Sequence, residues 1–467
     1  MIEQKLKKQY AGSLRLTDYF NSMDPKQLFA GDILNYLVMT TRLGQTNYVN
    51  LDNAATTPPL LSVENSVTAY LKGYGSVHRG AGTKSLVSTD EYEKSRAVIK
   101  QFVNAPSDAY VLFTGNTTGA MNTLAYFFAF LKGKVAVSTI EHSASWLPWV
   151  KAEGVKALGR RQGGLKDLEI VNVKIQKAGH IQVLQYGINE NFEFDYKKME
   201  ALLQKNYIKA LVVTASSNIT GYCPDLKKIS DLAHKYGAYF VVDGCQYIQH
   251  HKLDMQALDV DFLLASGHKF YAPYGGGFLI GPKNFFDKFL PYQIGGGNLP
   301  YITESGEFLR YANQLAHDPG TANAVGAVAM AKALTVLGEL GLDKVAEYEK
   351  KLTQRAYDYM RSNSKITLHV SQNHLNTIIP FSLVDMSADE VAERLNTDYG
   401  IGVRAGSFCV YHAVRSLLCI TDDEEITAAM RTGDTGLIPK MIRVSFSLCN
   451  SEADVDRLIS ALTEITK

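Results

Sequence analysis

Apolar runs typical of buried strands alternate with helical patterns along the middle of the chain, and no other feature of the sequence limits the fold as strongly. The strand-like runs cover residues 110–113, 135–137, 210–214, 239–242, 262–265 and 278–280. Helical patterns lie between them, as at residues 120–130 and 226–236. This alternation predicts an α/β protein in which a mostly parallel sheet lies between layers of helices.

The sequence predicts three successive parts. Residues 1–47 mix short apolar clusters with charged residues, and we expect helical pieces that pack on the main body. Residues 48–335 contain the alternating pattern and are expected to form a large domain. In residues 336–467, a long helical pattern followed by shorter strand and helix patterns predicts a smaller α+β domain.

The composition is that of a soluble globular protein, with 46% hydrophobic and 20% charged residues. A net charge of +1 gives no electrostatic reason to expect a nucleic acid or an anionic membrane as a partner. The longest apolar runs are shorter than the roughly 18 residues that a membrane span needs. The N-terminus lacks the apolar core of a secretory signal, so we expect a cytoplasmic protein with no membrane contact.

The cysteines also point to a reducing compartment. The five cysteines are an odd number, and none of them forms a Cys-x-x-Cys pair. This pattern argues against a disulfide framework and against a structural zinc site. We therefore expect no metal site.

A lysine lies between two of the predicted strands, where charged side chains are unusual. The strand at residues 262–265 is followed by Ser266-Gly-His-Lys269, and then by aromatic residues, a proline and three glycines. Inside a protein, desolvation disfavours a charged ammonium group. Such an amine can be a nucleophile that forms a Schiff base with an aldehyde or a cofactor. The alternative for a single lysine is a side chain that extends into solvent from a strand end.

A second candidate site lies where the strand at residues 110–113 gives way to a helix. The connecting residues are Thr114-Gly-Asn-Thr117-Thr118. At such a helix start, backbone N–H groups, the helix dipole and the hydroxyls converge on an anion, although simple capping of the helix by a threonine is the alternative. The glycine-rich stretches at residues 73–75 and 80–85 match neither a dinucleotide fingerprint nor a P-loop.

Two further polar residues follow predicted strands. Asp243 ends the run at residues 239–242, and a carboxylate at that depth needs a partner such as a protonated heterocyclic nitrogen or an arginine. His142 has a ring suited to stacking or proton transfer, although a lone histidine is often structural. A strand-end lysine, a strand-end aspartate, a phosphate-type helix start and a histidine are together what a pyridoxal 5′-phosphate site requires.

These residues belong to an ordered series of short motifs that the chain shares with a known family. The motifs are Leu51-Asp-Asn-Ala-Ala-Thr-Thr-Pro58, Val77-His-Arg-Gly80, Thr117-Thr118, Glu141-His-Ser143, Ser217-Asn-Ile-Thr-Gly221, Asp243-Gly-Cys-Gln246, Ser266-Gly-His-Lys269, Pro319-Gly-Thr321 and Val403-Arg-Ala-Gly-Ser-Phe-Cys409. In this order and spacing, the chain resembles the class V aminotransferase-fold enzymes, in particular the branch of cysteine desulfurases and selenocysteine lyases.

The resemblance implies a fold-type I transferase with a seven-stranded sheet in the large domain, a smaller C-terminal domain and pyridoxal 5′-phosphate as the cofactor. It implies that Lys269 holds the cofactor as a Schiff base and later carries the α-proton. Asp243 would pair with the pyridinium nitrogen and Gln246 would contact the ring hydroxyl. His142 would stack on the ring and assist catalysis.

The resemblance also assigns residues to the phosphate and to the substrate. The phosphate ligands would be Thr117, Thr118, Ser266, His268 and, from the partner subunit of a homodimer, Thr321. Asn218, Arg443 and Arg404 would contact the small amino-acid substrate, and Asn218 would also lie beside the cofactor. An arginine suits this role because its guanidinium group binds a carboxylate in a bidentate manner.

Cys409 matches the nucleophilic cysteine of this branch. The resemblance implies that its thiolate attacks the sulfur of L-cysteine, which leaves a persulfide on Cys409 and releases L-alanine. A sulfur-acceptor protein would then be a partner. The positive charge of Arg404 would favour the thiolate. The alternative for a lone cysteine is a buried small hydrophobic residue.

The sequence departs from the family pattern in two places, and these leave alternatives open. Ser407 and Phe408 precede Cys409 where the family often has histidines, and the segment 410–440 is longer than in the better-known desulfurases. That segment is a lid, a docking element or a solvated insertion. The other functions that remain open are a class V lyase, epimerase or aminotransferase for another amino acid, in which Cys409 is incidental, and a catalytically idle sulfur-transfer scaffold.

Overall fold

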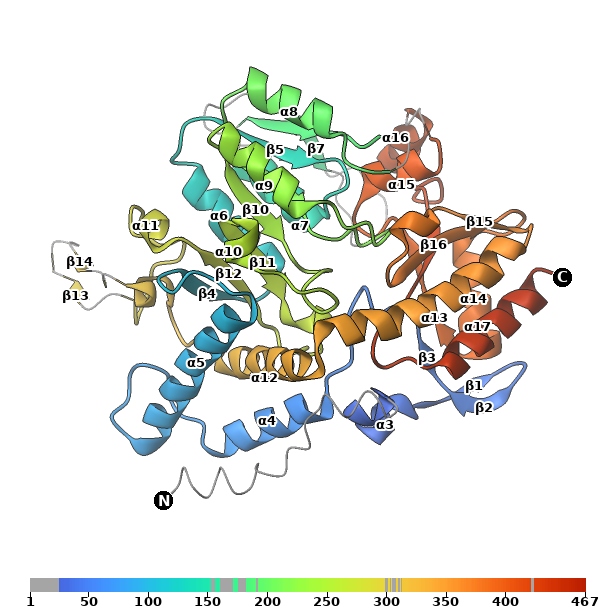
Figure 1. Ribbon diagram of the computed structural model, residues 1–467, viewed down its shortest axis with the longest axis horizontal. Coiled ribbons are helices and arrows are strands. Elements are labelled where there is room, and N and C mark those ends of the chain that lie inside the picture. Colours follow the sequence, from blue (N-terminus) through green and yellow to red (C-terminus); the bar gives the residue numbers. More distant parts are fainter. Residues whose placement is uncertain are drawn as a thin grey trace.

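The computed structural model describes residues 25–152, 156–159, 171–174, 182–189, 192–298, 301–302, 304, 308–309, 311, 313–420 and 424–467. Figure 1 shows a large body built around one sheet and, beside it, a smaller body that contains the C-terminus.

The large body is organised around a seven-stranded sheet. Across the sheet, the strands are β4 (Tyr110–Thr114), β12 (Gly277–Gly281), β11 (Phe262–Ser266), β10 (Tyr239–Asp243), β9 (Ile208–Thr214), β5 (Lys134–Ser138) and β8 (Val183–Tyr186). The pairings from β8 to β11 are parallel, and β12 pairs antiparallel with both of its neighbours. The predicted α/β class and the mostly parallel seven-stranded sheet are therefore confirmed.

These strands form because their side chains are apolar on both faces, which is typical of a sheet covered on both sides. Successive residues point to opposite faces, so that Leu211 and Val213 enter one core whereas Val212 enters the other. The first core is closed by α4 (Leu61–Lys72), α5 (Thr83–Phe102), α8 (Tyr196–Lys205), α9 (Leu226–Lys235), α10 (Met255–Leu258) and α12 (Ala324–Leu340), and the second by α6 (Thr117–Phe128), α7 (Ser143–Ala152) and α11 (Lys283–Phe286).

The smaller body has its own sheet and its own core. The sheet consists of β15 (Ile366–Leu368), β16 (Ile378–Leu383), β19 (Met441–Ser445) and β18 (Arg404–Gly406), packed against α13 (Leu342–Ser362), α14 (Ala388–Tyr399) and α17 (Glu452–Ile465). The early strand β3 (Val49–Asn50) pairs with β17 (Ile401–Gly402) and contributes to this core. The predicted boundary near residue 335 stays a prediction; it falls within α12, whose apolar residues up to Leu340 belong to the core of the large body.

The prediction of helical pieces over residues 1–47 was wrong for part of this range. After α3 (Gly31–Leu34), β1 (Leu37–Thr40) and β2 (Gly44–Asn47) form an antiparallel hairpin that contacts α14. Gly44 adopts a φ of +65° at the turn, a conformation that glycine reaches without strain. Residues 1–24 lie outside the described residues.

The remaining elements are short. They are η1 (Pro25–Leu28), β6 (Lys156–Gly159), β7 (Val171–Lys174), η2 (Gly267–Lys269), β13 (Tyr301–Ile302), β14 (Phe308–Leu309), η3 (Gln314–His317), η4 (Gln372–His374), α15 (Tyr411–Leu417) and α16 (Glu424–Arg431). In the part of the chain that the structure describes, no single helix is long and apolar enough to cross a membrane. The pair α12 and α13, bent by 83°, meets the length and composition criteria only when the two helices are taken together.

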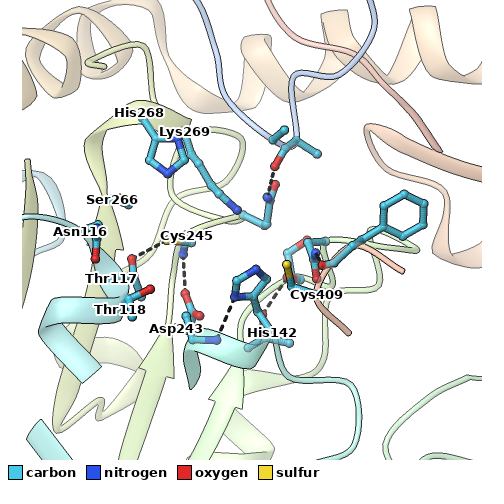
Figure 2. A pocket seen from close by; sticks show the side chains of 18 of the residues that line it. Asn116, Thr117, Thr118, His142, Asp243, Cys245, Ser266, His268, Lys269 and Cys409 are labelled. Carbon is cyan, nitrogen blue, oxygen red and sulfur yellow. Dashed lines mark hydrogen bonds between the residues drawn. The ribbon is translucent and has the colours of Figure 1, made fainter. Parts of the chain in front are cut away.

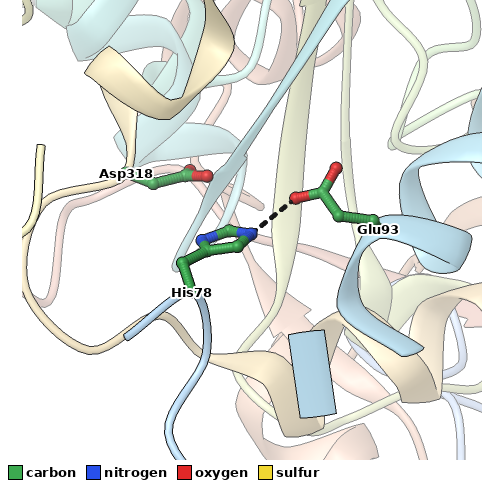
Figure 3. A group of neighbouring side chains, drawn as sticks. All are labelled: His78, Glu93 and Asp318. Carbon is green, nitrogen blue, oxygen red and sulfur yellow. Dashed lines mark hydrogen bonds and ion pairs between the residues drawn. The ribbon is translucent and has the colours of Figure 1, made fainter. Parts of the chain in front are cut away.

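A cluster of a histidine and two carboxylates lies beside α5, and Figure 3 shows its members, His78, Glu93 and Asp318. The Nε2 atom of His78 lies 2.8 Å from Oε1 of Glu93. The buried guanidinium group of Arg96 donates to Asp318 and, over 3.3 Å, to Glu93. Because Arg96 pairs with both carboxylates, we interpret this cluster as an ion-pair network that joins α5 to the segment before Thr321.

Replacement of Asp318 by asparagine is expected to lower the free energy of unfolding by about 3 to 5 kcal/mol, because the buried Arg96 loses its buried counter-charge and keeps only the half-exposed Glu93. Lys94→Ala is the matched control on the same helix, since Lys94 pairs with Asp90 and Glu91 at the exposed surface; its cost should be below about 1 kcal/mol. Urea unfolding followed by circular dichroism measures both. Equal effects of the two substitutions would contradict the assignment of the network as structural.

Candidate active site

A pocket of about 230 Å³ lies at the carboxyl ends of β9, β10 and β11, where the smaller body meets the central sheet. The sequence-predicted residues that line it are Thr117, Thr118, His142, Asn218, Asp243, Gln246, Ser266, His268, Lys269, Arg404, Cys409 and Arg443. Figure 2 shows most of these side chains around one space. The structure therefore brings together all predicted site residues except Thr321.

Lys269 lies in η2, directly after β11, and its side chain extends into the pocket (Figure 2). The turn is tight: a Cβ atom on Gly267 would come within 2.8 Å of the carbonyl oxygen of Ala272 and of the side chain of Met330. The carbonyl group of His268 accepts a hydrogen bond of 2.9 Å from the N–H of Thr57, which ties the turn to the start of the large body. Burial lowers the pKa of Lys269, so the amine is closer to its nucleophilic, neutral form.

Asp243 is the last residue of β10 and is 4% exposed. Its carboxylate accepts hydrogen bonds from the N–H of Cys245, over 3.0 Å, and from the hydroxyl of Ser145. These donors fix both oxygens at the floor of the pocket. A buried carboxylate of this kind suits a protonated ring nitrogen as its partner.

His142 lies just before α7, beside Asp243 (Figure 2). Burial, and then the positive charge of Lys269, lower the pKa of His142 to about 4. Its ring is therefore neutral at neutral pH. The Nδ1 atom accepts a hydrogen bond of 3.0 Å from the N–H of Ala144, which places the ring proton on Nε2.

The start of α6 forms one end of the pocket. Helix capping is provided by Asn116, whose side chain accepts from the N–H of Gly119 over 2.9 Å, so the alternative of capping by a threonine was wrong. The N–H groups of Thr117 and Thr118 have no partner within the helix, as in the first turn of any α-helix. The Oγ atom of Ser266 is buried and has no hydrogen-bond partner among the described residues. A phosphate group fits this set of donors.

The opposite end of the pocket carries positive charge. Arg443 of β19 is buried and donates to the carbonyl group of Asn218 and to the carboxylate of Asp52, each over 2.8 Å. Arg404 of β18 also lines the pocket. The side-chain amide of Gln246 donates to the carbonyl group of Ala54 over 2.6 Å, which fixes Gln246 on the pocket wall.

Cys409 lies on a constrained loop. Phe408 and Cys409 both have left-handed backbone angles, with φ of +52° and +59°, which cost free energy in residues other than glycine. Three hydrogen bonds from the large body hold the loop: Ser143 donates its N–H and its hydroxyl to the carbonyl group of Cys409, over 2.9 and 2.7 Å, and Asn218 donates to that of Phe408 over 2.9 Å. The thiol consequently lines the pocket that holds Lys269 (Figure 2).

Thr321 does not line the pocket and is exposed. Its assignment to the phosphate of a partner subunit stays a prediction. Sequence reasoning gave no role to Asp52, Ser143, Cys245 or Phe408, all of which contact predicted site residues. Each of these four residues lies inside one of the shared motifs. Ser143, Cys245 and Phe408 are next to an assigned residue, whereas the motif of Asp52 contains none.

A family model described as aminotransferase class V matches residues 49–458. The chain belongs to this family.

Similar proteins within the family share one kind of name. A probable cysteine desulfurase of Halalkalibacterium halodurans is 29% identical over 449 residues, which cover 95% of this chain and 97% of that protein. A cysteine desulfurase of Escherichia coli O7:K1 is 30% identical over 420 residues, which cover 89% of this chain and 92% of that protein. The sequence similarity thus extends over nearly the whole of each protein.

Solved structures agree with the sequence comparison. A cysteine desulfurase of Thermococcus onnurineus NA1 has a TM-score of 0.75 and 25% identity, with 90% of this chain and 94% of that chain covered. The cysteine desulfurase CsdA of Escherichia coli has a TM-score of 0.73 and 25% identity, with 89% of this chain and 94% of that chain covered. These comparisons confirm the predicted family, fold and kind of enzyme.

One buried carboxyl group beside the site should make stability depend on pH. Glu141 accepts hydrogen bonds from the hydroxyl of Ser138 and the N–H of Thr214 on one oxygen, and burial raises its pKa to about 8. Between its ordinary pKa and about 8, the unfolded state has lost this proton and the folded state keeps it. The free energy of unfolding therefore falls as the pH rises through this window, by up to about 1.4 kcal/mol per pH unit.

Glu141→Gln should flatten this pH dependence, because glutamine keeps the accepting oxygen and cannot ionise. Urea unfolding of wild type and variant at several pH values between about 5 and 8 measures the difference, which should grow with pH. Glu347→Gln, at an exposed ion pair of α13, is the control. Parallel profiles of wild type and Glu141→Gln would contradict the raised pKa of Glu141.

Proposed function

We propose that this protein is a pyridoxal 5′-phosphate-dependent cysteine desulfurase that converts L-cysteine to L-alanine and retains the sulfur as a persulfide on Cys409. The observation that carries the proposal is the common pocket: the thiol of Cys409, from the smaller body, and the amine of Lys269, from the large body, line the same space. The relatives named cysteine desulfurases support the reaction.

The residues present fit the cofactor at both of its ends. The start of α6 and the unpartnered hydroxyl of Ser266 would hold the phosphate, with Thr117, Thr118 and His268 around it. At the other end, Asp243 would hold the ring nitrogen and Lys269 would supply the amine for covalent attachment. When bound, the cofactor supplies an electron sink for the carbon atoms of the substrate.

The chain's own groups would then carry out the remaining steps. Arg443 and Asn218 orient the substrate carboxylate, and the neutral ring of His142 stacks beside the reacting centre. Lys269 accepts the α-proton. The Cys409 thiolate forms an S–S bond as the C–S bond of the substrate breaks. In sum, L-cysteine and a thiol give L-alanine and a persulfide, so the reaction needs no external oxidant.

We propose a cytoplasmic homodimer in which Thr321 of each subunit reaches the phosphate of the other, and a sulfur-acceptor protein that removes the persulfide. Selenocysteine lyase is the second candidate activity, because the same thiol and amine would act on a substrate that carries selenium in place of sulfur. The alternative of an idle scaffold is disfavoured by the complete set formed by Lys269, Asp243 and the phosphate-type helix start.

Lys269→Ala should abolish covalent attachment of the cofactor, because no other lysine lines the described pocket. The purified wild type should show the yellow absorbance band of a protonated Schiff base, and the variant should lack it after dialysis. Lys84→Ala, at the exposed surface, is the control. A variant that kept the yellow band after dialysis, or that kept the cofactor covalently bound after borohydride reduction and denaturation, would contradict the assignment of Lys269.

Cys409→Ala should abolish release of alanine from L-cysteine in the presence of a thiol reductant, with a loss of at least about 100-fold because the nucleophile is gone. Cys419→Ala, ten residues further on at an exposed position, should remain active. Alanine is measured by chromatography of the reaction mixture. Unchanged turnover in Cys409→Ala would contradict the desulfurase proposal and favour an enzyme for another amino acid, and activity that persisted on selenocysteine alone would favour the lyase.

A further inference from the structure

Two arginines lie directly opposite each other on neighbouring strands of the smaller body. Arg404 of β18 and Arg443 of β19 are cross-strand partners in an antiparallel pair, and both line the pocket. Like charges placed opposite each other on adjacent strands repel and destabilise the pair. The arrangement therefore requires a counter-charge that both side chains can reach.

Asp52 supplies this counter-charge. One of its carboxylate oxygens lies 2.8 Å from Nη2 of Arg443, and the other lies 3.7 Å from Nη1 of Arg404. Its backbone is fixed next to β19, because residue Asp52 forms a bridge with Ser445 and Leu51 accepts a hydrogen bond of 2.7 Å from the N–H of Ser445. The carboxylate therefore lies between the two arginines on a backbone that is fixed beside β19.

Arg443 has few ways to change its orientation. Its side chain is 2% exposed, and Nη1 donates to the carbonyl group of Asn218 over 2.8 Å while Nη2 donates to Asp52. The ring of Phe408 covers the guanidinium group, with 4.8 Å between its central carbon and the ring centroid. Burial lowers the pKa of Arg443, and the charge of Asp52 opposes this shift.

Donors on Arg443 nevertheless remain for a ligand. Its Nε atom is buried and has no hydrogen-bond partner in the part of the chain that the structure describes. Asp52 itself does not line the pocket, so it acts on a bound molecule only through the arginines. Two arginines and one aspartate leave one net positive charge at this corner, which matches a single α-carboxylate.

We propose that Asp52 is a positioning residue that holds Arg443 and Arg404 in the arrangement that binds the α-carboxylate of an amino-acid substrate. This inference rests on the proposed amino-acid substrate, but it does not depend on the desulfurase chemistry or on Cys409. In the absence of Asp52, Arg404 and Arg443 repel each other, and Arg443 loses the acceptor that fixes one edge of its planar group.

The test compares ligands that carry the carboxylate with ligands that lack it. With the cofactor-loaded enzyme, L-cysteine has an α-carboxylate and cysteamine is the same molecule without it. In Asp52→Ala, KM for L-cysteine should rise about tenfold or more, with kcat changed less than about threefold, as expected when a charge-assisted contact to the bound substrate is misplaced. Turnover of cysteamine, however slow, should be unaffected by the substitution.

Binding provides a second readout that needs no turnover. L-alanine and ethylamine are titrated into the loaded enzyme, and the shift of its absorbance band gives Kd for each. Asp52→Ala should raise Kd for L-alanine by a similar factor and leave Kd for ethylamine unchanged. If wild type binds L-alanine but releases none from L-cysteine, the desulfurase proposal fails and the role of Asp52 is still decided by this titration.

Two further variants test whether a general structural effect explains the loss of binding. Asp52→Asn keeps an oxygen that accepts from Arg443 but lacks the charge that restrains Arg404, so its KM and Kd should lie between those of wild type and Asp52→Ala. Asp456→Asn removes a carboxylate from an exposed pair with Arg355 and should behave as wild type. If Asp52→Ala does not fold, Asp52→Asn decides the question. Equal losses for ligands with and without the carboxylate, or no loss at all, would overturn the proposal.

Discussion

The parallel pairing of β9, β10 and β11 is the constraint on which the rest of the site depends. Asp243 lies in register with Thr214 on one side and with Leu264 on the other. Parallel strands in register bring their carboxyl ends to one edge of the sheet, where ligands bind in folds of this kind. The chain that leaves each strand therefore carries its polar side chains, Asn218, Asp243 and Lys269 among them, into the same small space.

Burial then sets the chemical state of these groups. The same desolvation that lowers the pKa of Lys269 lowers that of His142 to about 4, which favours the nucleophilic form of the amine and leaves a neutral ring beside it. Asp243 is deeper still, and its two oxygens are satisfied by Ser145 and by the N–H of Cys245. A site built in this way keeps its charges only where a partner or a ligand compensates them.

The smaller body contributes what the sheet lacks: a thiol and two guanidinium groups. Ser143 and Asn218 of the large body hold the Cys409 loop across the junction, and Asp52, beside β19, holds the arginines. Left-handed backbone at Phe408 and Cys409 costs on the order of 1–3 kcal/mol per residue, and such strain persists only where the surroundings enforce it. The position of the thiol is thus a property of both bodies together.

Local patterns in the sequence were sufficient for the α/β class, for six of the seven strands of the sheet and for the strand-end residues Lys269 and Asp243, because short apolar runs predict buried strands and their ends. They did not predict β8. The shared motifs added the family and most of the pocket. They did not predict the hairpin at residues 37–47, the capping of α6 by Asn116 or the bridge between Asp52 and the two arginines. The cap is local, but asparagine and threonine are both common N-cap residues, so the pattern does not decide between them. The hairpin is also local, whereas the bridge joins residues 391 positions apart, and a contact over that distance forms only when the segment of Asp52 packs beside β19 in the folded chain.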